Sequence, residues 1–259
     1  MSADVVTTPH GVPGRRAWVE KVMGMPVSIH LRGAGVDDPA AAEAVAAAQA
    51  EFRRMDATFS TYREDSDISR LRRGDVEIGD VDPLVAEALR IGEEAGLVTG
   101  GAFTVFLPTG EGDLAFDPTG LVKGWTVDRA SLHLASLDGI SWCINAGGDL
   151  LVGAHPWMPL EGPEAISWRV GIEDPRVPGR IARTVSLTSG AVATSGTAAR
   201  GAHLYDPEVG EMVGRAGSVT VTGPSLLWAD IWATALFVGG ERTRATFDAV
   251  AAGHRAFEV

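Results

Sequence analysis

The chain has 259 residues, 45% of them hydrophobic, which is enough to bury the core of one large domain. Its 34 acidic and 22 basic residues give a formal net charge of −12. This charge argues against a general binder of nucleic acids or anionic membranes, because such proteins cluster Lys and Arg. A single cysteine, Cys143, rules out an intrachain disulfide and a cysteine-rich zinc site, and its apolar neighbours predict a buried thiol.

The N-terminal segment, residues 1–14, is rich in Pro, Gly and Thr and is expected to be flexible, ahead of a folded domain at 15–259. It lacks the apolar region of a secretory signal. No stretch approaches the roughly 20 apolar residues that a membrane span needs. We therefore expect a cytoplasmic protein without membrane insertion, unless a targeting segment has been removed.

Hydrophobic patterns and capping residues predict a mixture of helices and short strands. Two apolar runs on either side of Gly24 predict a strand pair, and Asp38-Pro39 and Asp82-Pro83 are typical helix starts. The predicted helices cover 39–58, 83–97, 121–136, 225–238 and 241–252, and the predicted strands cover 17–23, 26–31, 141–145, 168–172, 183–187 and 218–221. Because no regular βαβ repeat occurs, this order predicts an α+β fold.

The most informative helix places a carboxylate and a hydroxyl in an apolar run. Asp230 and Thr234 are four residues apart, so they lie on the same helix face. A buried carboxylate is costly unless a charged group pairs with it, and a hard cation such as Mg²⁺ would satisfy both oxygens. The alternative is an Asp that hydrogen-bonds a neighbouring loop and a Thr that bonds back to its own helix.

Two further segments combine polar side chains with helix ends. Residues 59–69 carry aromatic and hydroxyl groups that suit a planar ring, although the same residues also suit an ordinary turn and cap. Residues 117–128 form a glycine-containing loop that runs into a helix, which suits a phosphate. Lys123 lies near that helix start and hints at an anionic partner; the alternative is a solvent-facing lysine on a capped helix.

The last two segments surround glycines. The glycine pair in 145–150 permits close backbone approach to a ligand or makes a simple hairpin turn, and it has neither Rossmann nor P-loop spacing. Residues 193–210 gather hydroxyls around His203, which is a candidate general base or a structural histidine.

Taken in order, these segments resemble the ApbE family of FAD:protein FMN transferases. The matching stretches are MGMPVSI at 23–29, FSTYREDSDISRL at 59–71, GLVKGWTVDRA at 120–130, NAGGDL at 145–150, ATSGTAARGAHLYDP at 193–207 and ADIWATALFVGG at 229–240. The resemblance runs from about residue 17 to the end of the chain. It implies one α+β flavin transferase domain over 15–259, with mixed helices and short, mainly antiparallel strands.

The resemblance also implies an activity. Members of the family use Mg²⁺ and FAD, transfer FMN through its phosphate to a threonine of a target flavoprotein, and release AMP. By matching positions, the metal would be held by Asp230, Thr234 and the backbone carbonyl of Gly120. His203 and Asp230 are the implied catalytic residues, with His203 deprotonating or steering the acceptor hydroxyl. The implied FAD contacts are Met25, Ser60, Tyr62, Ala102, Phe103, Thr104, Asp117, Lys123 and Leu204.

Two other functions stay open at this point. One is a Mg²⁺-dependent FAD pyrophosphatase that makes FMN and AMP, and the other is a flavin-binding or delivery protein without turnover. The chain departs from many relatives at Phe103-Thr104, where Phe-Asp is common, and at 197–200, where an aromatic residue is common. These departures bear on the acceptor and on the balance between transfer and hydrolysis. Mg²⁺ and Mn²⁺ both suit oxygen ligands.

Overall fold

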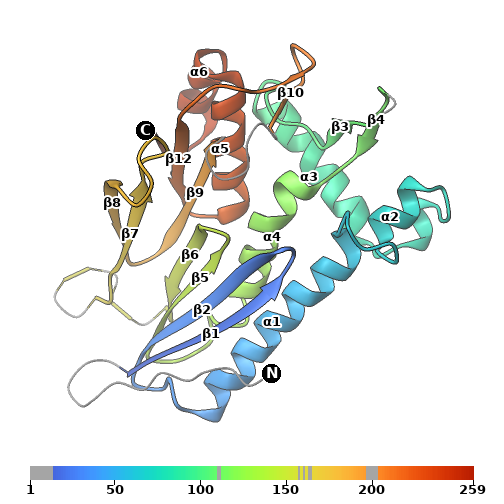
Figure 1. Ribbon diagram of the computed structural model, residues 1–259. Helices are drawn as coiled ribbons and strands as arrows, with labels where there is room; N and C mark the ends of the chain where they lie inside the picture. Colours follow the sequence, from blue (N-terminus) through green and yellow to red (C-terminus); the bar gives the residue numbers. More distant parts are fainter. Residues whose placement is uncertain (1–13, 110–111, 157, 160, 163–164, 197–203) are drawn as a thin grey trace.

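The computed structural model describes residues 14–109, 112–156, 158–159, 161–162, 165–196 and 204–259 (Figure 1). Its central element is a seven-stranded sheet of order β1-β2-β5-β6-β9-β12-β13, in which every neighbouring pair is antiparallel. The strands are β1 Gly14–Val22, β2 Met25–Gly33, β5 Ile140–Ala146, β6 Asp149–Ala154, β9 Gly190–Gly196, β12 Ser218–Gly223 and β13 Arg255–Glu258.

Helices and small hairpins complete the fold. The helices are α1 Pro39–Phe59, α2 Asp67–Arg72, α3 Leu84–Val98, α4 Thr119–Ser131, α5 Leu226–Gly239 and α6 Glu241–Val250, with a short 3₁₀ turn at Ile78–Asp80. The hairpins pair β3 Phe106–Pro108 with β4 Leu114–Phe116, β7 Trp168–Glu173 with β8 Ile181–Leu187, and β10 Tyr205–Asp206 with β11 Glu211–Met212. In the described part of the chain, no helix has the length and apolar character needed to cross a bilayer.

The strands separate two hydrophobic layers because alternate side chains point to opposite faces of a sheet. On β2, Val27, Ile29 and Leu31 belong to the main core, which the helices share. A second, smaller cluster lies under the β7–β8 hairpin and consists of Cys143, Leu150, Val152, Trp168 and Val192. The predicted burial of the Cys143 thiol is therefore confirmed, and burial raises the pKa of this thiol to about 12.

The α+β prediction and most predicted elements are confirmed. The helix predicted at 121–136 begins two residues earlier and ends at Ser131, since the following residues form turns instead. Gly14, predicted to be flexible, already belongs to β1, and the rest of 1–14 lies outside the described residues. The strands β6, β9 and β13 were not predicted: β6 directly follows a glycine pair, β9 contains glycine and hydroxyl residues, and β13 has four residues, too few to show a clear alternation.

Helices α4 and α5 pack closely because α4 has no side chain at Gly124. A Cβ atom built at this position would lie 2.8 Å from the carbonyl oxygen of Leu226 and 3.0 Å from the Cα of Leu227. One turn further along α4, the half-buried carboxylate of Asp128 accepts hydrogen bonds from the α5 N-terminus. Its donors are Ser225 Oγ at 2.7 Å, Leu226 N at 2.8 Å and Leu227 N at 2.9 Å. Asp128 thus satisfies two backbone N–H groups that have no partner within α5.

Replacing Gly124 with alanine is expected to destabilise the protein by about 1–3 kcal/mol, because the methyl group would push against backbone that cannot move aside. Gly96→Ala is the matched control, since Gly96 lies inside α3 and an added Cβ would come no closer than 3.4 Å to Phe103 O. The higher helix propensity of alanine should leave that control at least as stable as the parent. Urea unfolding of both variants measures the difference, and equal stability of the two would contradict the close-contact account.

Replacing Asp128 with alanine should lower the free energy of unfolding by about 2–4 kcal/mol, because it leaves two N–H donors without their acceptor. Asp128→Asn retains one side-chain oxygen and should lose less. Chemical denaturation followed by circular dichroism gives both values. A loss in the asparagine variant as large as in the alanine variant would show that these hydrogen bonds are not the cause.

Candidate active site

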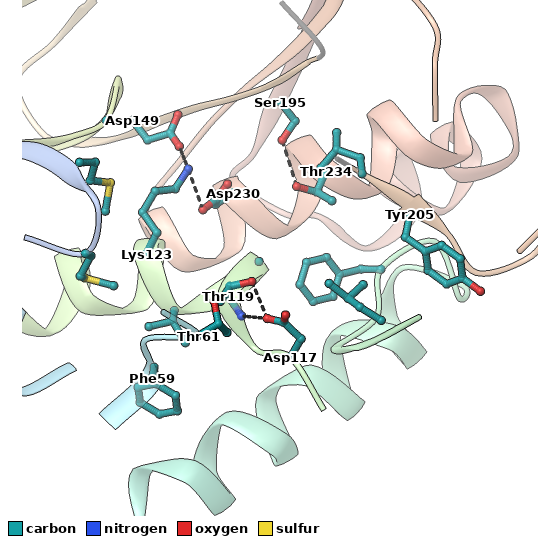
Figure 2. A pocket seen from close by; sticks show the side chains of 18 of the residues that line it. Phe59, Thr61, Asp117, Thr119, Lys123, Asp149, Ser195, Tyr205, Asp230 and Thr234 are labelled. Atoms are coloured by element: carbon teal, nitrogen blue, oxygen red, sulfur yellow. Dashed lines mark hydrogen bonds and ion pairs between the residues drawn. The ribbon is translucent and has the colours of Figure 1, made fainter. Parts of the chain in front are cut away.

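One cavity of about 440 Å³ lies where the α4–α5 pair meets the end of α1 and the ends of several strands (Figure 2). The structure brings together around it every predicted binding residue that it describes. These are Met25, Ser60, Tyr62, Ala102, Phe103, Thr104, Asp117, Gly120, Lys123, Leu204, Asp230 and Thr234. His203 lies outside the described residues, so its catalytic role stays a prediction.

Lys123 lines the cavity and lies between two buried carboxylates. Its ammonium forms an ion pair with Asp149, and its Nζ atom lies 3.4 Å from Oδ2 of Asp230 (Figure 2). Asp149 is 3% exposed and Asp230 is 4% exposed. Buried charges of this kind are tolerated when they are paired. The alternative interpretation of Lys123 as a solvent-facing lysine is therefore wrong. The residue lies in the second turn of α4, and its ammonium contacts carboxylates of its own chain.

The backbone also helps to hold Asp149. Its Oδ1 atom accepts a hydrogen bond from the backbone N–H of Thr194 on β9, at 2.8 Å. Asp149 is the first residue of β6, directly after the glycine pair, so the strand places it between α4 and β9. The segment 145–150 was predicted as a place of close approach to a ligand, but no role was predicted for this carboxylate. The position of Asp149 directly after two glycines could have marked it as a candidate. Its pairing with Lys123 could not be predicted, because the two residues are far apart in the sequence.

Two hydroxyl groups, those of Ser195 and Thr234, line the cavity together with Asp230. Thr234 Oγ1 and Ser195 Oγ share a hydrogen bond of 3.0 Å, which joins α5 to β9 (Figure 2). Thr234, Asp230 and Gly120 all line the cavity, as the helix periodicity predicts for the first two. Within the described residues, no group of three or more His, Cys, Asp or Glu side chains is placed to hold a metal ion. The available donors are instead carboxylate, hydroxyl and carbonyl oxygens, a set that fits a hard cation such as Mg²⁺.

The end of α1 and the residues that follow it line part of the cavity. Phe59 ends this helix and packs edge-on against Trp125 of α4, with ring centroids 6.0 Å apart. Tyr62, three residues further on, is 93% exposed. An exposed aromatic ring that lines a cavity is available for stacking on a planar ligand.

Asp117 is held by its own neighbours at the start of α4. Its Oδ1 atom accepts hydrogen bonds from Thr119 N at 3.0 Å and Thr119 Oγ1 at 2.5 Å (Figure 2). Its Oδ2 atom forms an ion pair with Arg72 at 2.7 Å. These contacts fix the loop before α4 and set the direction in which the first N–H groups of this helix point.

The turn between β1 and β2 contributes a residue that the sequence analysis did not assign. Met23 lines the cavity beside Met25 and has a φ of 54°, the one positive φ of a non-glycine residue in the described chain. Gly24 follows with a φ of 72°. This pair of left-handed residues makes the tight two-residue connection of the hairpin and directs the Met23 position to the cavity.

The sequence model of the ApbE family matches residues 23–109 and 107–254. A FAD:protein FMN transferase of Vibrio cholerae is 31% identical over 140 residues, which are 50% of this chain and 40% of that protein. One from Haemophilus influenzae is 28% identical over 136 residues, 48% of this chain and 38% of that protein. The aligned part therefore spans less than half the length of these curated relatives.

Solved structures show the same fold. The crystal structure of the ApbE protein of Thermotoga maritima superposes with a TM-score of 0.74 at 22% identity, covering 95% of this chain and 94% of that chain. The apo form of the Pseudomonas stutzeri flavinyl transferase ApbE gives a TM-score of 0.75 at 24% identity, covering 97% of this chain and 93% of that chain. Since the family model matches most of its length and the fold agrees, the chain belongs to the ApbE family.

Proposed function

We propose that the protein is a Mg²⁺-dependent FAD:protein FMN transferase. It would cleave the pyrophosphate of FAD, attach FMN through its phosphate to a threonine of a target flavoprotein, and release AMP. The names of the curated relatives support the choice of reaction. The observation that carries the proposal is that one cavity is lined both by the Lys123 ammonium and by carboxylate, hydroxyl and carbonyl oxygens of α4 and α5.

A pyrophosphate suits this cavity for two reasons. Lys123 presents a positive charge, and the first N–H groups of α4 begin at Thr119 and Gly120, which line the same cavity. A helix N-terminus favours anions because its N–H groups lack partners within the helix and its dipole end is positive. Asp149 would keep the lysine in place through their ion pair.

The cation would be held by Asp230, Thr234 and the carbonyl of Gly120, whose oxygens are the hard ligands that Mg²⁺ prefers. When bound, the ion supplies neutralisation of the negative charge that builds up on the phosphates. Thr234 is oriented for this role by its hydrogen bond with Ser195. The contribution of these residues is positioning and charge compensation, as is general for phosphoryl transfer.

The transfer step exchanges one P–O bond for another. The threonine oxygen of the acceptor bonds to the FMN phosphorus, the bond from that phosphorus to the AMP oxygen breaks, and AMP leaves. The threonine proton passes to a base, for which His203 is the proposed group. The exposed ring of Tyr62 is available to stack on a ring of FAD, and Ser60 and Asp117 line the same cavity.

Incubating the purified protein with FAD and a threonine-containing acceptor peptide, with and without Mg²⁺, tests the reaction. We expect Mg²⁺-dependent AMP release, with FMN attached to the peptide, both followed by chromatography and mass spectrometry. AMP with free FMN in equal amounts would instead establish a pyrophosphatase. FAD that binds without being consumed in the presence of acceptor and metal would favour a flavin carrier, and absence of FAD binding would overturn the proposal.

Asp230→Asn should lower AMP release at fixed Mg²⁺ by at least about 10- to 100-fold, because it removes the charged ligand while preserving shape, and the loss of a group that only supports a metal ligand already has an effect of this size. Part of the loss should be recovered at higher Mg²⁺ if the residue acts through the metal. Asp248→Asn is the control, since Asp248 is an exposed carboxylate on α6 that pairs with Arg244. Circular dichroism checks that both variants are folded. Full activity of Asp230→Asn at low Mg²⁺ would remove Asp230 from the site.

A further inference from the structure

The outer face of the β1–β2 hairpin, on the side of the sheet away from the helices, carries only positive charge. Strand alternation places Arg15, Ala17, Val19 and Lys21 of β1 and Pro26, Ser28, His30 and Arg32 of β2 on this face. It therefore holds three formal cations and a histidine but no carboxylate, in a chain whose formal net charge is −12. Such segregation of charge is not expected from composition alone.

Two of these cations occupy directly opposite positions on the two strands. Arg15 and Arg32 are direct partners in the β1–β2 register. Like charges at directly opposite positions destabilise an antiparallel pair. Within the described residues, neither guanidinium forms an ion pair with a carboxylate, whereas Arg16 on the opposite face pairs with Asp37 at 3.8 Å.

The Arg32 side chain is held in place from the β7 side. The Arg32 guanidinium lies 3.8 Å from the ring centroid of Trp168 and donates a hydrogen bond to the carbonyl of Ser167 at 3.1 Å. The Trp168 indole in turn donates to Ser141 Oγ at 2.8 Å. Because an arginine has five N–H donors, this arrangement fixes the planar guanidinium while leaving donors for another acceptor.

These residues line a second cavity, of about 220 Å³, between the hairpin and Trp168. His30 also lines it and forms a hydrogen bond with Ser28 Oγ at 3.0 Å. None of its lining residues belongs to the larger cavity. Its volume is below the range of roughly 300–1,000 Å³ that holds drug-sized ligands, so it suits a small molecule.

We propose that this second cavity is a binding site for a small oxyanion ligand, one that carries a phosphate or a carboxylate group. Arg15 and Arg32 would bind the oxyanion by charge-assisted hydrogen bonds, for which the guanidinium fork is well shaped. The ligand would also remove the repulsion between the two arginines. Burial, followed by the charges of Arg32 and Arg15, lowers the pKa of His30, so a bound anion would favour the protonated imidazole as a third donor.

The test is calorimetric titration of the full chain with inorganic phosphate and, separately, with succinate, each against sodium chloride of equal ionic strength. Arg15→Gln and Arg32→Gln are expected to weaken binding of at least one probe by tenfold or more. Arg15 is exposed, so its replacement disturbs little packing even if that of Arg32 does. Arg90→Gln is the control, because this exposed arginine lies on α3 and pairs with Glu94.

Phosphate could also enter the larger cavity, so Lys123→Met is titrated in parallel. Binding that survives in Lys123→Met and Arg90→Gln but is lost in Arg15→Gln supports the proposal. Binding that is lost only in Lys123→Met overturns it, as does binding that none of the variants changes or no binding to the parent chain. Binding of a polyglutamate peptide or of phosphatidylglycerol vesicles without binding of either small anion would replace the proposed ligand class by a macromolecular partner. The proposal does not rest on FMN transfer, so failure of either leaves the other standing.

Discussion

The close contact between α4 and α5 is the constraint on which the site depends. Gly124 lets the two helices approach, and Asp128 ties the first turn of α5 to α4 through three hydrogen bonds. Lys123 and Asp230, the residues proposed to bind the phosphate and the cation, lie in the same two helices as these anchors. The α4–α5 contact therefore determines both the stability of the protein and the geometry of the site. A displacement of one helix along the other would change both. This explains how a strongly apolar helix can present a carboxylate in a defined position.

The electrostatics of the site follow from burial. Two carboxylates with low exposure, Asp149 and Asp230, share one ammonium, so this group of three side chains carries a formal charge of −1. Removing charged groups from water is costly, which favours a further positive charge among the surrounding oxygens. The proposed cation and the proposed phosphate substrate are complementary in charge: the cation neutralises the negative charge of the phosphate, and the phosphate balances the positive charge of the cation. Lys123 links the two requirements, since it can pair with a carboxylate of the chain or with a phosphate.

Local patterns predicted much of the fold and of the site. The N-terminal strand pair, the long helices and the shared face of Asp230 and Thr234 all follow from periodicity and capping within a few residues, and the structure confirms them. The pairing of Lys123 with Asp149 could not be predicted in this way, because it depends on β6 lying beside α4. The strand β6 itself was missed, since it follows a glycine pair that reads as a turn. The cationic face of the β1–β2 hairpin could not be predicted either, because it depends on the strand register that places Arg15 opposite Arg32.

The turn at Met23 combines a strained backbone conformation with a side chain that shapes the larger cavity. A residue with a side chain in the left-handed region costs roughly 1–2 kcal/mol relative to the right-handed one. Asn or Gly would adopt this turn with less strain, as two-residue hairpin connections generally prefer. Met23 instead places a thioether side chain on the wall of the larger cavity. A search for thermostable variants would therefore select substitutions in this turn. The substitutions that stabilise the hairpin most would also change the wall of the cavity.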